Sequence, residues 1–133
     1  MNSSQGTHDK GLMTFFAGAP IKQRYLFGSF FGPYIIPTEG KKFWAIAVIC
    51  DVGEKDEIVA GQIMGSNDST MKVLAGGPIS AGDLITANNF GQAVNFQLED
   101  EPGSYRIYGI ALSRAQSGQC VEFTPTLGLQ LSK

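Results

Sequence analysis

Short apolar runs rich in β-branched and aromatic residues alternate along the chain with clusters of glycine, proline, asparagine and aspartate. Runs of this kind, bounded by turn-forming residues, are typical of β-strands. No window of about ten residues keeps an amphipathic helical period, because glycine, proline or a strand-like run interrupts it. We expect little helix and strands at Leu12–Phe16, Tyr25–Phe31, Tyr34–Ile36, Phe43–Asp51, Glu57–Met64, Met71–Leu74, Asp83–Thr86, Ala93–Leu98, Tyr105–Ser113 and Cys120–Thr124.

Four residues carry structural roles in the turns. The sequence SAGD at 80–83 predicts a tight turn at Gly82 that begins a strand, with the Asp83 carboxylate bonded to local backbone amides. Gly91 closes a turn after two asparagines that tolerate left-handed backbone. Gly109 lies in a small-residue strand that we expect to pass close to another backbone.

Two parts of the chain resemble each other. The sequence AGAPI at 17–21 is similar to AGGPI at 75–79, and strand-like runs and polar loops follow each in the same order, at a spacing of about sixty residues. We expect one all-β domain over 11–133, a small barrel or β-clip-like fold, either undivided or built from two related β units at 17–64 and 75–124. Residues 1–10 are polar and small, so we expect them to form a flexible N-terminal arm.

Charge and size exclude several classes of protein. With 133 residues the chain is long enough to bury a core without disulfides or metals. The 10 basic and 12 acidic residues give a net charge of −2, which offers no basic surface for nucleic acid. No apolar run spans a bilayer, and no secretory signal is visible, so we expect synthesis in the cytoplasm. Cys50 and Cys120 lack metal-ligand spacing, and buried free thiols are favoured over a disulfide between them.

The residues offer little for catalysis. His8 is the one histidine and lies in the predicted arm, where a mobile base would lose the positioning that catalysis needs. One histidine and two distant cysteines do not make a transition-metal site, and the acidic clusters lie beside turn signals. The segment GSFFG at 28–32 lacks the Lys-Ser/Thr ending of a phosphate-binding loop. We therefore expect no enzyme, no cofactor and no metal.

Aromatic residues gather in the first half of the chain. They can form the core, an exposed platform for sugar or peptide, or the centre of a subunit contact, where aromatic side chains on a surface of low charge are favoured. As candidates for a subunit or capsid interface we take Tyr25, Phe27, Phe30, Phe31, Tyr34 and Trp44.

The second half carries a pattern found in a known group. AGGPISAGDLIT at 75–86, QAV at 92–94, YRIYGIAL at 105–112 and SGQCVEF at 117–123 follow one another. Together these motifs resemble the pattern of small tailed-phage capsid decoration proteins. The resemblance covers about half of the chain. The same unit is also similar to SAF-type β-clip domains, which occur in sugar-acid enzymes and in pilus or flagellar assembly proteins.

The resemblance implies a structural virion protein that binds the outside of an expanded phage head and stabilises it. Its partners would be the major capsid protein and copies of itself, with a trimer favoured over a dimer, and it would bind neither nucleic acid nor membrane. The alternative is a sugar- or small-ligand-binding β-clip module, within an enzyme or an appendage assembly system. A decoration protein would bury some of the aromatic residues between subunits, whereas a binding module would leave an open aromatic pocket.

Overall fold

The computed structural model describes residues 12–39, 45, 47–64, 70–97, 104–126 and 130–132, and within these ranges the chain is all-β, without a helix. The predicted all-β class with a small barrel is confirmed. Residues 1–10, the predicted arm, lie outside the described residues. The strands are β1 (Leu12–Ala17), β2 (Leu26–Phe31), β3 (Tyr34–Pro37), β4 (Ala47–Ile49), β5 (Ile58–Ile63), β6 (Met71–Leu74), β7 (Leu84–Ala87), β8 (Ala93–Asn95), β9 (Ser104–Arg106), β10 (Gly109–Ala111), β11 (Cys120–Pro125) and β12 (Gln130–Ser132).

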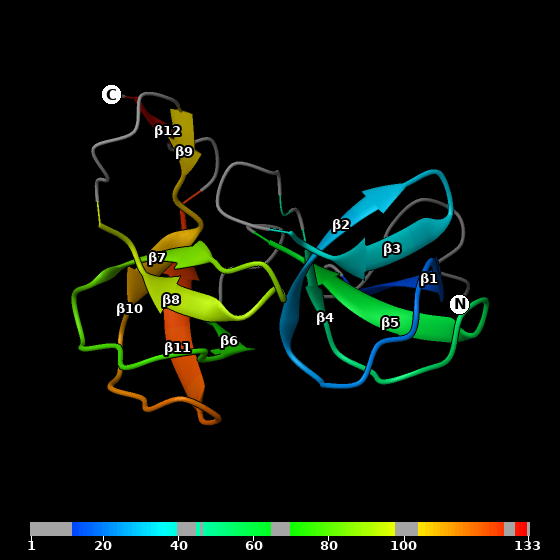
Figure 1. The fold of residues 1–133 in the computed structure, drawn as a ribbon, viewed down its shortest axis with the longest axis horizontal. Helices are drawn as coiled ribbons and strands as arrows, with labels where there is room; N and C mark the ends of the chain where they lie inside the picture. Colours follow the sequence, from blue (N-terminus) through cyan, green and yellow to red (C-terminus); the bar gives the residue numbers. More distant parts are fainter. Residues whose placement is uncertain are drawn as a thin grey trace.

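Each predicted strand overlaps an observed one, and there are two larger differences. The run predicted as one strand at Tyr105–Ser113 is divided into β9 and β10. Between them, the backbone N–H of Tyr108 donates to the carbonyl of Ile85 at 2.8 Å. The second difference is β12, which was not predicted and pairs with β9 as a separate two-stranded ribbon (Figure 1).

Strands β1 to β5 close into a barrel in the order β1-β3-β2-β4-β5. The β1–β3 pair is parallel and the other pairs are antiparallel. Because side chains alternate along a strand, every second residue points into the barrel. The interior holds a buried core of Phe15, Ala17, Ile21, Ile35, Ala47, Ile49 and Val59.

Five further strands repeat this arrangement. They form a sheet in the order β6-β11-β10-β7-β8, and one parallel bridge between Ala75 and Ala93 links β8 back to β6. When β1 is matched with β6, β2 with β7, β3 with β8, β4 with β10 and β5 with β11, every pairing in one unit has a counterpart in the other. We call these the N-terminal unit (β1–β5) and the C-terminal unit (β6–β8, β10 and β11). Apart from their first strands, β1 and β6, the units overlap the two segments that resemble each other in sequence, 17–64 and 75–124.

Individual hydrogen bonds repeat as well. Ile21 and Gly53 exchange two backbone hydrogen bonds, of 2.8 and 3.0 Å. Ile79 and Ala115, at the matching places, exchange bonds of 2.9 and 3.0 Å. In each of the loops before β5 and β11, a side-chain oxygen accepts the backbone N–H of the residue three positions earlier. The two units therefore share their loop geometry as well as their strand order.

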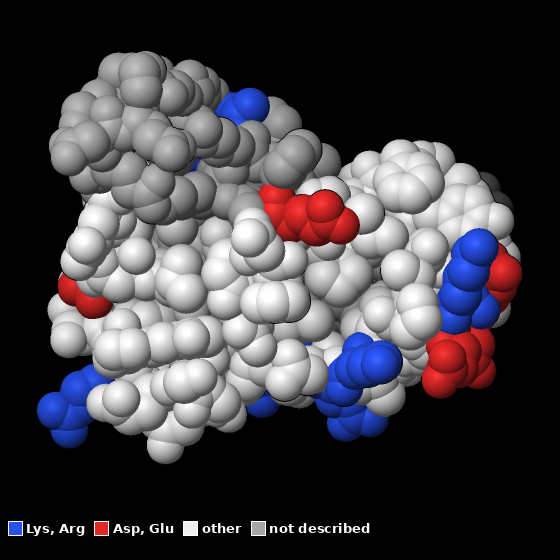
Figure 2. Space-filling view, in the orientation of Figure 1, with Lys and Arg blue, Asp and Glu red and all other residues white. Residues whose placement is uncertain are grey.

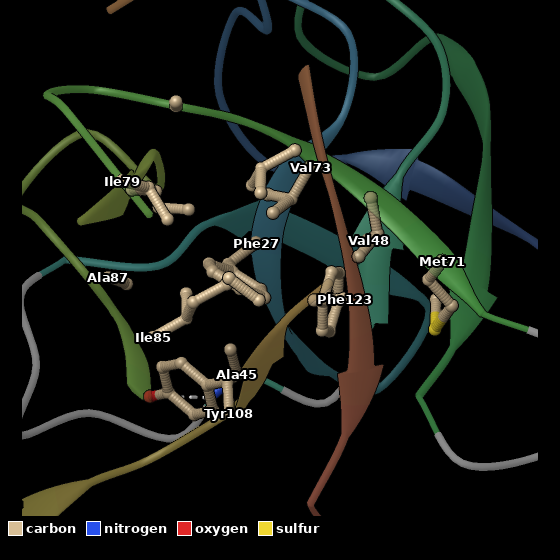
Figure 3. Packing of buried hydrophobic residues seen from close by; sticks show 14 of the residues in the cluster. Phe27, Ala45, Val48, Met71, Val73, Ile79, Ile85, Ala87, Tyr108 and Phe123 are labelled. Carbon is tan, nitrogen blue, oxygen red and sulfur yellow. Dashed lines mark hydrogen bonds between the residues drawn. The ribbon is translucent and has the colours of Figure 1, made fainter. Parts of the chain in front are cut away.

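The larger buried core extends across the junction of the two units. Phe27 and Val48 point outward from the barrel and belong to the same buried cluster as Ile85 and Phe123 of the C-terminal unit (Figure 3). The Phe27 ring centroid lies 5.0 Å from that of Tyr108 and 5.6 Å from that of Phe123. The N-terminal unit thus supplies part of the core of the C-terminal unit.

Backbone hydrogen bonds fix this junction. The N–H of Leu74, at the end of β6, donates to the carbonyl of Tyr25 at 2.7 Å. The N–H of Phe27 donates to the carbonyl of Gly91, just before β8, also at 2.7 Å. The segment 25–27 therefore occupies the gap between β6 and β8, where only one bridge joins these two strands.

Candidate interaction surface

Four large apolar side chains form a continuous row across the outer surface of the N-terminal unit. Ile58 on β5 is the pairing partner of Phe16 on β1, Phe16 of Tyr34 on β3, and Tyr34 of Phe31 on β2. The ring centroids of Phe16 and Tyr34 lie 6.0 Å apart, and those of Tyr34 and Phe31 lie 6.2 Å apart. Both distances fall in the range of favourable aromatic pairs. We call these four residues the apolar row.

The side chains of the apolar row are exposed. The exposed fraction is 67% for Ile58, 58% for Phe31, 42% for Phe16 and 36% for Tyr34. In the space-filling view, the surface over β2 and β3 is white, and charged side chains lie toward the edges of this area (Figure 2). Because exposed large apolar side chains that adjoin one another are a feature of interaction sites, the apolar row is the candidate interaction surface.

The candidate aromatic residues divide between this surface and the interior. Phe31 and Tyr34 lie in the apolar row. Tyr25 is half-buried against the junction core, with its ring 4.5 Å from the Lys72 ammonium. Phe30 is half-buried and packs against the barrel core.

Phe27 corrects one part of the expected interface. Its exposed fraction is 0%, so it belongs to the core of this chain and is closed to a partner. The reason is that the C-terminal unit covers the outward face of β2 at this position. Trp44, the remaining candidate, lies outside the described residues.

Two residues of the apolar row were not among the candidates. Phe16 follows Phe15, and strand alternation requires that when Phe15 enters the core, Phe16 points outward. The adjacent pair was the available signal, although alternation alone does not say which of the two is inside. Ile58 directly follows a polar loop, and no pattern in the sequence shows that it is exposed.

Two of the turn glycines have a backbone conformation that favours glycine. Gly82 has a φ of 92° and Gly91 a φ of 80°, in the left-handed region that favours glycine. The Asp83 carboxylate accepts the backbone N–H of Ser80 at 2.8 Å, which is the local role that the turn motif predicts. A Cβ on Gly91 would lie 2.8 Å from the Phe27 carbonyl oxygen, so this glycine also permits the close junction of the units.

Gly109 lies against β11. A Cβ at this position would overlap the ring of Phe123 and would lie 2.6 Å from the carbonyl oxygen of Thr124. Because Gly109 has no side chain, β10 can pack closely against β11 while the Phe123 ring lies where a Cβ at position 109 would be.

A groove of about 560 Å³ runs along the junction of the two units. Of the aromatic residues, only Phe90 is among its lining residues, and its exposed fraction is 70%. Lys22 and Glu39 also line the groove. None of the described candidate aromatic residues lines it, so the apolar row and the groove are separate features of the surface.

The described residues contain no group of three or more His, Cys, Asp or Glu side chains placed to hold a metal ion. Both thiols are free, with Cys50 half-buried and Cys120 exposed, so the expectation that both are buried was wrong. Burial raises the pKa of the Cys50 thiol above its ordinary value, and the adjacent Asp51 carboxylate raises it further. Within the described part of the chain, no helix is long and apolar enough to cross a membrane.

Comparison with known proteins shows a shared fold. No protein-family model matches the chain, and no curated protein matches its sequence. Among solved structures, the chain is similar to the N base of head fiber gp8.5 in bacteriophage phi29, with a TM-score of 0.63 and 23% sequence identity. The match covers 86% of this chain and 92% of that one. The likeness therefore extends over both units and concerns the fold.

Proposed function

We propose that this chain is a structural protein of a phage virion that binds the outside of the expanded head and stabilises it. The observation that carries the proposal is the likeness in fold to the phi29 head fiber base, which covers 86% of this chain. The ordered motifs at 75–86, 105–112 and 117–123, which resemble those of capsid decoration proteins, independently favour the same class.

The proposed partners are the major capsid protein and other copies of this chain, assembled as a trimer in preference to a dimer. The role is mechanical and involves no catalysis and no cofactor. A protein that binds the assembled, expanded lattice and not its other states stabilises that lattice by mass action, in proportion to occupancy and affinity. Many symmetric copies and several contacts per oligomer would strengthen the effect through multivalency.

The apolar row supports a protein partner. Its four side chains carry no charge, and their exposed aromatic and aliphatic surface is of the kind found at the centre of protein–protein interfaces. Nucleic acid would instead require clustered Lys and Arg.

A second candidate function is small-ligand binding in the junction groove. The groove volume of about 560 Å³ lies within the range of ligand sites, and its lining is largely apolar with Lys22, Gln23, Glu39 and Asn89 as polar groups. This candidate requires no capsid.

Co-sedimentation separates the two candidates. Purified chain is mixed with expanded phage heads stripped of their surface proteins, and in parallel with unexpanded heads. We expect saturable binding to expanded heads only, and a higher melting temperature of the decorated heads. A matched variant, Phe90→Asp, changes the groove and should bind heads as the wild type does. If neither head form binds the chain, capsid decoration is refuted. A metabolite and glycan screen of the wild type, with Phe90→Asp as the control in which the groove is changed, then tests ligand binding in the groove.

A further inference from the structure

A smaller pocket, of about 290 Å³, lies beside strand β6 and is lined by residues of both units. It shares no lining residue with the junction groove. Its lining includes Val48 and Met71, which are buried in the junction core (Figure 3), and the exposed side chains of Lys72 and Glu122. We call it the β6 pocket. It combines apolar surface with one positive and one negative charge.

The two charged residues of the β6 pocket are opposite each other on neighbouring strands. Lys72 on β6 is the pairing partner of Glu122 on β11, an arrangement in which opposite charges attract. The structure describes both side chains, and no ion pair joins them. The Lys72 ammonium lies 4.5 Å from the centre of the Tyr25 ring, and the Glu122 carboxylate accepts the Thr70 hydroxyl at 3.5 Å. Neither charge is therefore neutralised by the other.

The backbone of Lys72 adds an open donor and an open acceptor. In an antiparallel pair, alternate residues direct their N–H and C=O groups toward the partner strand and away from it. The N–H of Ala75 donates to the carbonyl of Gln119, just before β11, at 2.7 Å. By alternation, the backbone groups of Leu74 and Lys72 face the other edge of β6. Leu74 bonds there to Tyr25, whereas no described residue bonds to the backbone of Lys72.

The charges of the β6 pocket balance at neutral pH. The Cys50 thiol also lines the pocket, and burial, together with the adjacent Asp51 carboxylate, raises its pKa above the ordinary value. The thiol is therefore uncharged at neutral pH, and the Lys72 ammonium and the Glu122 carboxylate remain. A ligand that carries one carboxylate and one ammonium group complements this pair of charges.

We infer that the β6 pocket binds a free α-amino acid with an apolar side chain, its carboxylate on Lys72 and its ammonium on Glu122. The backbone N–H and C=O of Lys72 supply a further donor for the carboxylate and a further acceptor for the ammonium. Val48 and Met71 contact the apolar side chain. This site goes beyond the proposed virion role and does not depend on binding to heads.

The size of the site favours a single amino acid over an extended peptide. A volume of about 290 Å³ lies at the lower end of the range of ligand pockets. A peptide strand added to β6 would have to pair along the whole edge, and Tyr25 already occupies that edge at Leu74.

The two thiols of the unaltered chain report occupancy of the pocket. Cys50 lines the pocket, whereas Cys120 is exposed and lies outside its lining. The full-length chain is alkylated with iodoacetamide at increasing concentrations of L-leucine, and mass spectrometry follows each thiol separately. We expect L-leucine to slow the alkylation of Cys50 saturably and to leave that of Cys120 unchanged. N-acetyl-L-leucine, which lacks the ammonium, and L-leucinamide, which lacks the carboxylate, should require concentrations about tenfold higher.

Charge-removing variants test the two contacts directly. Lys72→Gln and Glu122→Gln should each raise the L-leucine concentration that protects Cys50 by about tenfold. Lys22→Gln and Glu39→Gln remove the same charges from the junction groove and should behave as the wild type. Near-UV circular dichroism checks the fold of each variant, and the comparison of ligands on the wild type needs no variant. The inference is overturned if L-leucine does not protect Cys50, if it protects both thiols equally, or if the two analogues protect as well as L-leucine.

Discussion

Two non-glycine residues among those described have a positive φ, and each corresponds to a glycine in the other unit. Tyr25 has a φ of 65° and matches Gly82 at 92°, while Asp56 has a φ of 73° and matches Gly118 at 89°. The left-handed region is strained for residues with a Cβ. The N-terminal unit keeps the strained backbone at Tyr25, whose ring packs at the junction core.

The loops at Asp56 and Gly118 allow this strain to be measured. A Cβ on Gly118 would have no neighbour within 4 Å, so Gly118→Ala tests conformation alone. We expect its free energy of unfolding to fall by about 1 kcal/mol. Asp56→Gly removes the strain at the matching position, and we expect a rise of about 0.5 kcal/mol, because the more flexible unfolded chain offsets part of the gain. Urea denaturation measures both, and changes of the same sign would contradict this explanation.

Tyr108 links the units through its hydroxyl group. The phenol oxygen accepts the backbone N–H of Ala45 at 3.1 Å, and burial raises the pKa of Tyr108 from 10.0 to about 12. Since the folded state holds this proton more tightly than the unfolded state, its contribution to stability is complete below pH 10 and is lost as the pH rises toward 12.

Tyr108→Phe isolates that contribution. Below pH 10 the variant should be less stable than the wild type by about 1 kcal/mol, because the Ala45 N–H loses its acceptor. Above pH 10 the phenol of the unfolded wild type is ionised while the buried phenol stays protonated, so only the wild type must take up a proton on folding, and the difference should shrink as the pH rises. Urea denaturation at a series of pH values from 8 to 11.5 measures it. A difference that stays constant through this range would show that Tyr108 does not titrate with the raised pKa.

At the scale of elements, matching strands of the two units carry large and small core side chains at different positions. Gly61 in β5 corresponds to Phe123 in β11, and Phe15 in β1 corresponds to Val73 in β6. In the barrel, a Cβ on Gly61 would lie 3.0 Å from the Phe15 ring. In the C-terminal unit the aromatic ring comes from β11 instead of the first strand. Interiors are filled to a similar density, so a ring gained on one strand requires space on its neighbours.

Gly109 provides that space, and filling it tests the argument. We expect Gly109→Ala to lower the free energy of unfolding by about 1–3 kcal/mol, because the added methyl group meets both the Phe123 ring and the β11 backbone. Gly77→Ala is the matched control, since a Cβ on Gly77 would have no neighbour within 4 Å. Thermal denaturation compares them. Equal effects of the two substitutions would mean that the crowding at Gly109 is relieved by movement of the strand.

The strands themselves could be read from the sequence because their signals are local. Runs of β-branched and aromatic residues between turn clusters indicate the position of each strand. The turn motif at Gly82 and Asp83 likewise predicts the hydrogen bond between the Asp83 carboxylate and a nearby backbone N–H. The division between β9 and β10 depends on Tyr108 bonding to β7, which is distant in sequence. Likewise β12 exists through pairing with β9 alone, and a local pattern carries no information about that partner.

At the scale of the whole molecule, the site was only partly predictable for the same reason. The aromatic segment was identified from the sequence. However, of the two outward positions on β2, Phe27 is buried, with an exposed fraction of 0%, and Phe31 is exposed, with a fraction of 58%. Alternation places both on the outer face of the barrel. Only the docking of the C-terminal unit on one end of β2 decides that Phe27 is core and Phe31 is surface.

This docking makes the C-terminal unit depend on the N-terminal one. The barrel has its own enclosed core, whereas the core of the C-terminal unit includes Phe27 and Val48 from its neighbour. We expect Phe27→Ala to lower stability by about 3–5 kcal/mol, as for other buried phenylalanines. Hydrogen exchange should rise most in β6, β7 and β11, while β1 and β5 keep their protection.

Phe15→Ala is the matched control, because Phe15 is 5% exposed and lies in the core of the barrel. It should cost a similar amount of stability but raise exchange in the barrel strands first. Since the opened barrel would also withdraw Phe27 from the junction, exchange in the C-terminal unit should follow. The expected asymmetry is therefore that Phe27→Ala loosens one unit and Phe15→Ala loosens both. If each variant instead raises exchange uniformly across all strands, the two units unfold as a single cooperative body, and the barrel has no independent stability.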